Sequence, residues 1–161
     1  MQEEDVIQII EPSDKVLQKA EFYIQLIKKI LPNATVTLIG SLAIPVCVKN
    51  EMDILIEIDK NEDIQTIQEK VRDESGDIFG IGPIENNEGY SRSKKKHGII
   101  CELHILHKDD ERIEKYLEQV RRFRNDPELA KKYSDLKRSL NGASNSVYKE
   151  RKAMFFQENS L

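Results

Sequence analysis

Four segments have apolar, β-branched or alternating patterns that are typical of β-strands. They are residues 6–10, 35–39, 52–58 and 99–106. The second segment runs into Gly40–Ser41, a pattern typical of a strand that ends in a tight turn. In the third, the even positions are apolar and Asp53 lies on the opposite face. In the fourth, the odd positions are apolar, so Glu102 and His104 share the other face.

Helical spacing of apolar residues predicts five helices. They are residues 16–31, 62–73, 110–123, 127–141 and 145–157. Ser13–Asp14 is a helix start signal, and Asp126–Pro127–Glu128 is another, with proline at the first helical position. The stretch 76–98 holds five of the seven glycines and predicts loops and short strands. We therefore expect an α+β fold, a mixed sheet with packed helices (1–109) followed by a helical C-terminal third (110–161).

Composition narrows the class of protein. A chain of 161 residues with a net charge of −4 fits one domain and argues against a general nucleic-acid-binding protein, whose surface would be broadly basic. No apolar run is long enough for a membrane helix, and the acidic start is unlike a signal peptide. Cys47 and Cys101 lie in apolar runs without a CxxC partner, which predicts reduced core thiols of a cytoplasmic protein and no structural zinc site.

Gly40–Ser41 and Asp53 form the first candidate site. Glycine lets the backbone approach a ligand closely, and a serine hydroxyl suits phosphate oxygens. A carboxylate on the neighbouring strand could hold the Mg²⁺ that accompanies a nucleotide phosphate. The same pattern also fits a plain glycine turn beside an edge-facing aspartate.

Glu102 and His104 form the second candidate site. Residues two apart on a strand point the same way, so both side chains could face the cavity that Asp53 faces. A carboxylate and an imidazole would serve as metal ligand and general base. The alternative is a solvated sheet face. A third candidate is a basic stretch that either holds polyphosphate or is a solvated helix face. It comprises Arg121, Arg122, Arg124, Lys131, Lys132, Lys137 and Arg138.

Several motifs occur in a fixed order along nearly the whole chain. They are Ile39-Gly40-Ser41, Pro45, Lys49, Met52-Asp53-Ile54-Leu55, Gly89-Tyr90, Glu102-Leu103-His104, Pro127-Glu128, Ala130, Tyr133, Leu136-Lys137, Leu140, Tyr148, Lys152 and Phe155. Together they resemble the signature of the GrpB-like family, which belongs to the nucleotidyltransferase-fold superfamily. The resemblance implies that 1–161 is a single nucleotidyltransferase-like domain.

The resemblance also implies roles for individual residues. Asp53, Glu102 and His104 would be catalytic, with Asp53 and Glu102 as ligands of Mg²⁺. The residues implied to bind the phosphates of a nucleotide or another phosphorylated small molecule are Gly40, Ser41, Lys49, Arg124, Lys137 and Lys152. Active nucleotidyltransferases carry a second aspartate where this chain has Leu55. Two functions therefore stay open: a metal-dependent nucleotidyltransferase, and a lapsed fold that acts as a binding module of the dephospho-CoA kinase or protein-folding accessory type.

Overall fold

The computed structural model describes residues 6–46, 48–49 and 51–161, and the side chains of residues 48 and 49 lie outside that description. The strands are β1 (Ile9–Ile10), β2 (Thr35–Ile39), β3 (Val48–Lys49), β4 (Glu51–Ile58), β5 (Ile84–Glu85), β6 (Glu88–Arg92) and β7 (Ile100–His107). The helices are α1 (Asp14–Ile30), α2 (Ile64–Glu74), α3 (Glu111–Asn125), α4 (Pro127–Ser139) and α5 (Asn145–Glu158), with short 3₁₀ turns at Ser41–Ala43 (η1) and Lys95–His97 (η2).

The main sheet has five strands in the order β2-β4-β7-β6-β5. Strands β4 and β7 are parallel neighbours, and the other pairs in this sheet are antiparallel. The two-residue strands β1 and β3 form a separate antiparallel pair. The mixed sheet with packed helices that the sequence predicts is therefore confirmed.

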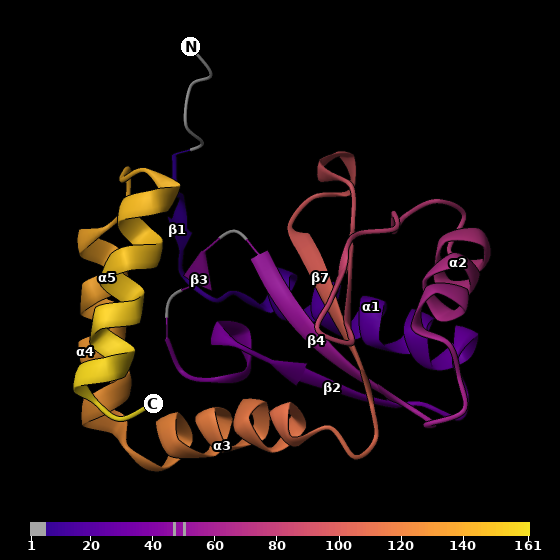
Figure 1. Cartoon of the computed structure of the whole chain (residues 1–161). Helices are drawn as coiled ribbons and strands as arrows, with labels where there is room; N and C mark the ends of the chain where they lie inside the picture. Colours follow the sequence, from indigo (N-terminus) through magenta and orange to yellow (C-terminus); the bar gives the residue numbers. More distant parts are fainter. Residues whose placement is uncertain (1–5, 47, 50) are drawn as a thin grey trace.

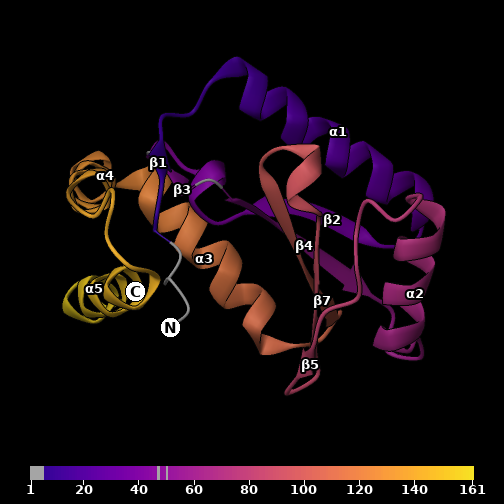
Figure 2. The ribbon, with the colours of Figure 1, turned by 90° about the horizontal axis from the view of Figure 1, so that it is seen from above.

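Helices cover both faces of the sheet (Figures 1 and 2). Helices α1 and α2 pack on one face against the apolar residues of β4 and β7, among them Met52 and Leu103. Helices α3 and α4 pack on the other face, where Leu55 of β4 joins Phe123 and Tyr133 in a second core. Both faces of β4 are therefore buried, which explains why apolar residues interrupt the polar side of its alternation.

The predicted boundaries agree with the structure to within a few residues at most ends. Ser13 caps α1 and Asp126 caps α4, as the start signals indicated. The predicted opening strand 6–10 is shorter, because only Ile9–Ile10 pairs as a strand. Cys101 is a free, buried thiol, whereas Cys47 lies outside the described residues. Within the described part of the chain, no helix has the length and apolar character that crossing a membrane requires.

Candidate functional site

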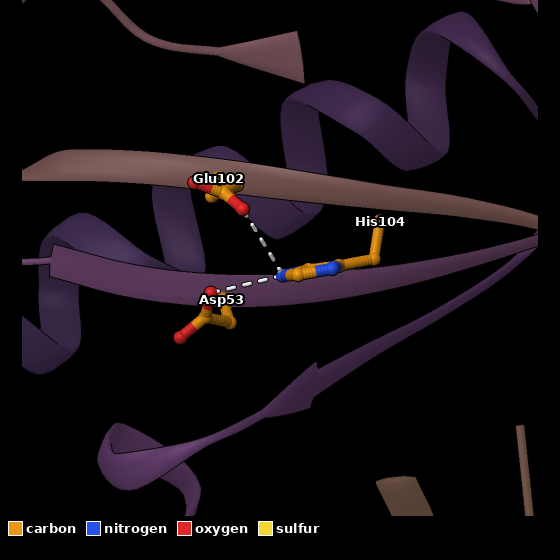
Figure 3. A group of neighbouring side chains, drawn as sticks. All are labelled: Asp53, Glu102 and His104. Carbon is orange, nitrogen blue, oxygen red and sulfur yellow. Dashed lines mark hydrogen bonds and ion pairs between the residues drawn. The ribbon is translucent and has the colours of Figure 1, made fainter. Parts of the chain in front are cut away.

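Asp53, Glu102 and His104 lie together over strands β4 and β7 (Figure 3). This is the face of the sheet that α3 covers, because Leu55 of β4 packs with Phe123 of α3 on the same side. Asp53 and Glu102 are register partners across the parallel β4–β7 pair. His104 follows Glu102 by two residues on β7 and therefore projects from the same face. The structure thus brings the three predicted acid and imidazole groups to one place. Strand β4 is interior to the sheet, so the alternative of an edge-facing aspartate is wrong.

The three side chains are close enough to share one ion. His104 Nε2 lies 2.9 Å from Asp53 Oδ1 and 3.8 Å from Glu102 Oε1. One ligand atom from each residue lies within 4.8 Å of the others. Only 11% of the His104 side chain is exposed, against 22% for Glu102 and 33% for Asp53. The site is therefore largely buried and opens to solvent mainly past Asp53.

The cluster perturbs the protonation of its own members. Burial opposes a charge on His104, but the hydrogen bond to Asp53 and the negative charges of Asp53, Glu102 and Glu88 outweigh burial and raise the pKa of His104. Burial raises the pKa of Glu102, and the charge of Asp53 adds to that effect while His104 opposes it. Such coupled shifts are common at functional sites.

A buried carboxylate binds the two tyrosines that contact the His104 ring. Glu88 is 2% exposed and accepts hydrogen bonds from the hydroxyls of Tyr90 and Tyr116, the latter at 2.9 Å. The two phenol rings flank His104, with centroid distances of 5.5 Å to Tyr90 and 5.4 Å to Tyr116. Tyr90 is also the register partner of His104 on β6. This arrangement, the tyrosine clamp (Glu88, Tyr90 and Tyr116), packs against the imidazole.

Gly40 lies against the acid cluster at the end of β2. Its backbone has φ 68° and ψ −159°, a region that is essentially open to glycine alone. A Cβ atom placed there would stand 2.7 Å from Asp53 Oδ2. The turn can therefore approach Asp53 only because residue 40 is glycine.

A cavity of about 170 Å³ opens beside the cluster. Asp53 and His104 line it, together with Gly40, Ser41 and Lys152. Its remaining wall is mostly apolar and aromatic. That wall is formed by Ile39, Ile44, Tyr116, Gln119, Val120, Phe123, Tyr133 and Phe156. A ligand here could contact Asp53, His104 and Lys152 through polar groups and the aromatic wall through apolar groups.

The basic residues implied by the resemblance lie in different places. Lys152 lines the cavity, and its ammonium lies 5.4 Å from the centroid of the Phe156 ring. Lys137 is 1% exposed and donates a hydrogen bond to Ser41 Oγ. Arg124 donates from Nε to the Ala43 carbonyl, 2.9 Å away, and so contacts the backbone of the Gly40–Ser41 turn region. The side chain of Lys49 lies outside the described residues.

Much of the basic stretch is occupied by contacts within the protein. Arg121 pairs with Glu114 and Glu118. Other pairs and hydrogen bonds join Arg122 to the Ser160 carbonyl, Lys131 to Asp135, and Arg138 to Glu11. These contacts favour a solvated helix face over a polyphosphate-binding surface.

The donor set fits one divalent ion. Two carboxylates and one imidazole are all groups that ligate divalent cations. Leu55, at the position of the second aspartate, is 0% exposed and belongs to the core beneath α3. A pair of ions bridged by two aspartates of β4 therefore does not fit this chain.

The sequence comparison identifies the family. The family model described as "GrpB protein" matches residues 6–160. The chain belongs to the GrpB family. A search of curated proteins gives no match.

Solved structures show the same fold. The conserved GrpB protein from Enterococcus faecalis is 20% identical, with a TM-score of 0.68 over 97% of this chain and 100% of that one. The Cid1 poly(U) polymerase with MgGTP bound is 17% identical, with a TM-score of 0.56 over 76% of this chain. A cytoplasmic RNA terminal U-transferase is 20% identical, with a TM-score of 0.54 over 75% of this chain. This GrpB-family chain spans about 41% and 37% of those two enzymes and has a nucleotidyltransferase-like fold.

The tyrosine clamp is the part of the site that sequence reasoning missed. Gly89–Tyr90 belongs to the motif set, but Glu88 and Tyr116 carried no signal of their own. The pattern of segment 76–98 indicates only loops and short strands, which hides the fact that Glu88 and Tyr90 lie on one face of a strand. Their alternation, together with an aromatic residue on the helix that follows β7, is the signal that could have found the clamp.

Proposed function

We propose that this protein binds one divalent cation together with a nucleotide or another phosphorylated small molecule, and transfers a nucleotidyl or phosphoryl group from it. The observation that supports this proposal is the shared cavity: Asp53 and His104 line it alongside Ser41 and Lys152. Carboxylates attract the cation, and a hydroxyl and an ammonium suit phosphate oxygens. The fold alone would not support an activity.

Each residue has a distinct part in this proposal. Asp53 and Glu102 would hold the cation, with His104 beside them as a further ligand or as general base. The ion, Mg²⁺ in the simplest case, would neutralise phosphate charge and polarise a phosphoryl oxygen. Ser41 and Lys152 would bind the phosphate, and the buried ammonium of Lys137 orients the Ser41 hydroxyl.

A second candidate function follows from Leu55. A buried leucine replaces the second carboxylate of the fold's usual pair, which favours a lapsed transferase that retains ligand binding. In that case the protein would be a binding module, such as an accessory to dephospho-CoA kinase or to protein folding. Both functions require a ligand to bind in the cavity, but only the transferase would turn that ligand over.

Calorimetry with ATP, with and without Mg²⁺, tests the proposal on the full chain. Because the cation would be shared between the carboxylates and the phosphates, each ligand should bind more tightly in the presence of the other. Asp53→Asn should abolish this coupling and yet keep an oxygen that accepts the hydrogen bond from His104. Asp59→Asn is the matched control, because Asp59 follows the same strand and its carboxylate lies on the surface beside Lys108.

Release of phosphate or pyrophosphate separates the two functions. Turnover that Asp53→Asn removes and Asp59→Asn retains supports the transferase. Coupled binding without turnover supports the binding module. If the folded wild type binds no nucleotide with or without the cation, the nucleotide proposal is overturned.

A further inference from the structure

The three clustered side chains offer two kinds of donor atom. Asp53 and Glu102 provide oxygen, whereas His104 provides nitrogen through Nε2, the ring atom that faces both carboxylates (Figure 3). Mg²⁺ strongly prefers oxygen ligands and gives up its water molecules reluctantly. Imidazole instead suits first-row transition metals, and carboxylate together with imidazole suits Mn²⁺ and Zn²⁺.

The imidazole cannot easily leave the ligand shell. His104 is 8% exposed and contacts the rings of Tyr90 and Tyr116, whose hydroxyls are both bound to Glu88. Turning Nε2 away from the carboxylates would break its hydrogen bond to Asp53 and disturb these ring contacts. A mixed shell of nitrogen and oxygen donors is therefore already assembled, whereas Mg²⁺ would use only the two carboxylates together with water or phosphate oxygens.

The distances between the donor atoms suit a single small divalent ion. Metal–ligand bonds of about 2.0–2.2 Å put neighbouring ligand atoms roughly 3–3.5 Å apart. The observed separations from Nε2 are 2.9 Å to Asp53 and 3.8 Å to Glu102, so small side-chain shifts would suffice. Because Leu55 adds no ligand, the protein would fill three positions, and the others would remain open toward the cavity that Asp53 and His104 line. Three protein ligands with open positions is the usual arrangement of a catalytic metal site.

We propose that Asp53, Glu102 and His104 form a mononuclear site that prefers a transition-metal ion, Mn²⁺ or Zn²⁺, to Mg²⁺. This inference rests on the proposed function only for the existence of a cation at the cluster. It goes further in naming the class of ion. It also makes His104 a ligand of that ion and not merely its neighbour.

Titration calorimetry of the metal-free full chain with MnCl₂, ZnCl₂ and MgCl₂ tests the preference. Mn²⁺ and Zn²⁺ should bind with a stoichiometry of one at the cluster and at least about tenfold more tightly than Mg²⁺. His104→Gln should weaken Zn²⁺ binding by about 10–100-fold and leave the Mg²⁺ affinity within about threefold. His107→Gln is the matched control: His107 lies on the same strand, binds the Glu62 carbonyl and should leave all three affinities unchanged.

A spectroscopic measurement needs no variant and so does not depend on how His104→Gln folds. Electron spin echo modulation of the Mn²⁺-loaded wild type should show coupling to a directly bound ¹⁴N nucleus. If Mg²⁺ binds as tightly as Mn²⁺ and no nitrogen coupling is seen, this inference is overturned while the cation-dependent function stands. If none of the three ions binds the folded protein, this inference is also overturned, and the proposed function is then decided by the ATP titrations with and without Mg²⁺.

Discussion

At the residue scale, the close approach of Gly40 to Asp53 shapes the site. Gly40 is the residue after β2, and its positive φ carries the chain across the face from which Asp53 projects. An L-residue at this position would meet both a forbidden backbone region and the carboxylate at 2.7 Å. The turn and the acid are therefore positioned together.

Gly40→Ala should destabilise the protein by about 1–3 kcal/mol, because the backbone region is essentially restricted to glycine. It should also displace the Asp53 carboxylate and weaken Mn²⁺ binding. Denaturant unfolding and metal calorimetry measure the two effects. Gly98→Ala is the control: Gly98 has a similar conformation, φ 100° and ψ −140°, with open space around it. That variant should lose stability and keep its affinity for the ion. Equal losses of affinity in both variants would contradict this role for Gly40.

The residue-scale prediction from sequence succeeded where alternation decides the face. Asp53, Glu102 and His104 follow a period of two in clearly apolar strands, so their shared face could be predicted. Their parallel register could not, because it depends on how β4 and β7 pair across 40 intervening residues or more. Lys137 shows the opposite limit. Its charge alone predicts a position on the surface. In the structure, however, Lys137 is only 1% exposed and donates a hydrogen bond to Ser41.

Helix boundaries show the same contrast at the scale of elements. Starts marked by a cap and a proline, such as that of α4, were predictable because one side chain satisfies the free N–H groups. Strands β5 and β6 were not, since Gly89 and short polar segments give little alternation. Gly89 is explained only by packing, because a Cβ there would lie 2.4 Å from Ile64 of α2. Tertiary contacts supply what the local pattern lacks.

The start of α3 should contribute a pH-dependent part of the stability. Asp110 caps this helix by accepting a hydrogen bond from the backbone N–H of Arg112, and it also pairs with the Arg112 guanidinium at 2.6 Å. The guanidinium holds the pKa of Asp110 at about 2, below its ordinary value of 3.8. Because the pKa of Asp110 is lower in the folded than in the unfolded state, the ionised carboxylate stabilises the fold at any pH above its unfolded-state pKa. This contribution is lost as the pH falls from about 4 to about 2.

Asp110→Asn should therefore lower the free energy of unfolding by about 1 kcal/mol at pH 7, since asparagine still caps a helix but does not pair with arginine. The difference from wild type should shrink to nearly zero as the pH approaches 2. Urea unfolding between pH 7 and pH 2 measures it, with Glu111→Gln as a first-turn control. A difference that is independent of pH would contradict the ion-pair explanation.

At the scale of the whole molecule, the site lies where the sheet and the helical tail meet. The second core joins Ile39, Leu55 and Leu106 of the sheet to Leu129 and Tyr133 of α4. Helix α5 adds Phe155, whose ring stacks on Tyr133 at 5.3 Å. The cavity therefore has the sheet as one wall and the tail as the other, so ligand binding requires both parts in place.

We propose on this basis that residues 1–161 unfold as one cooperative unit. Leu129 is 5% exposed, whereas Leu136 is only half-buried, although helical spacing predicts both in the core. Leu129→Ala should cost about 2–5 kcal/mol, and Leu136→Ala should cost about 1 kcal/mol. Calorimetric unfolding should show a single transition in which each variant shifts the entire peak. Two transitions, of which the variants shift only one, would mean that the tail folds separately. The wall of the cavity that α3, α4 and α5 provide would then form without the sheet.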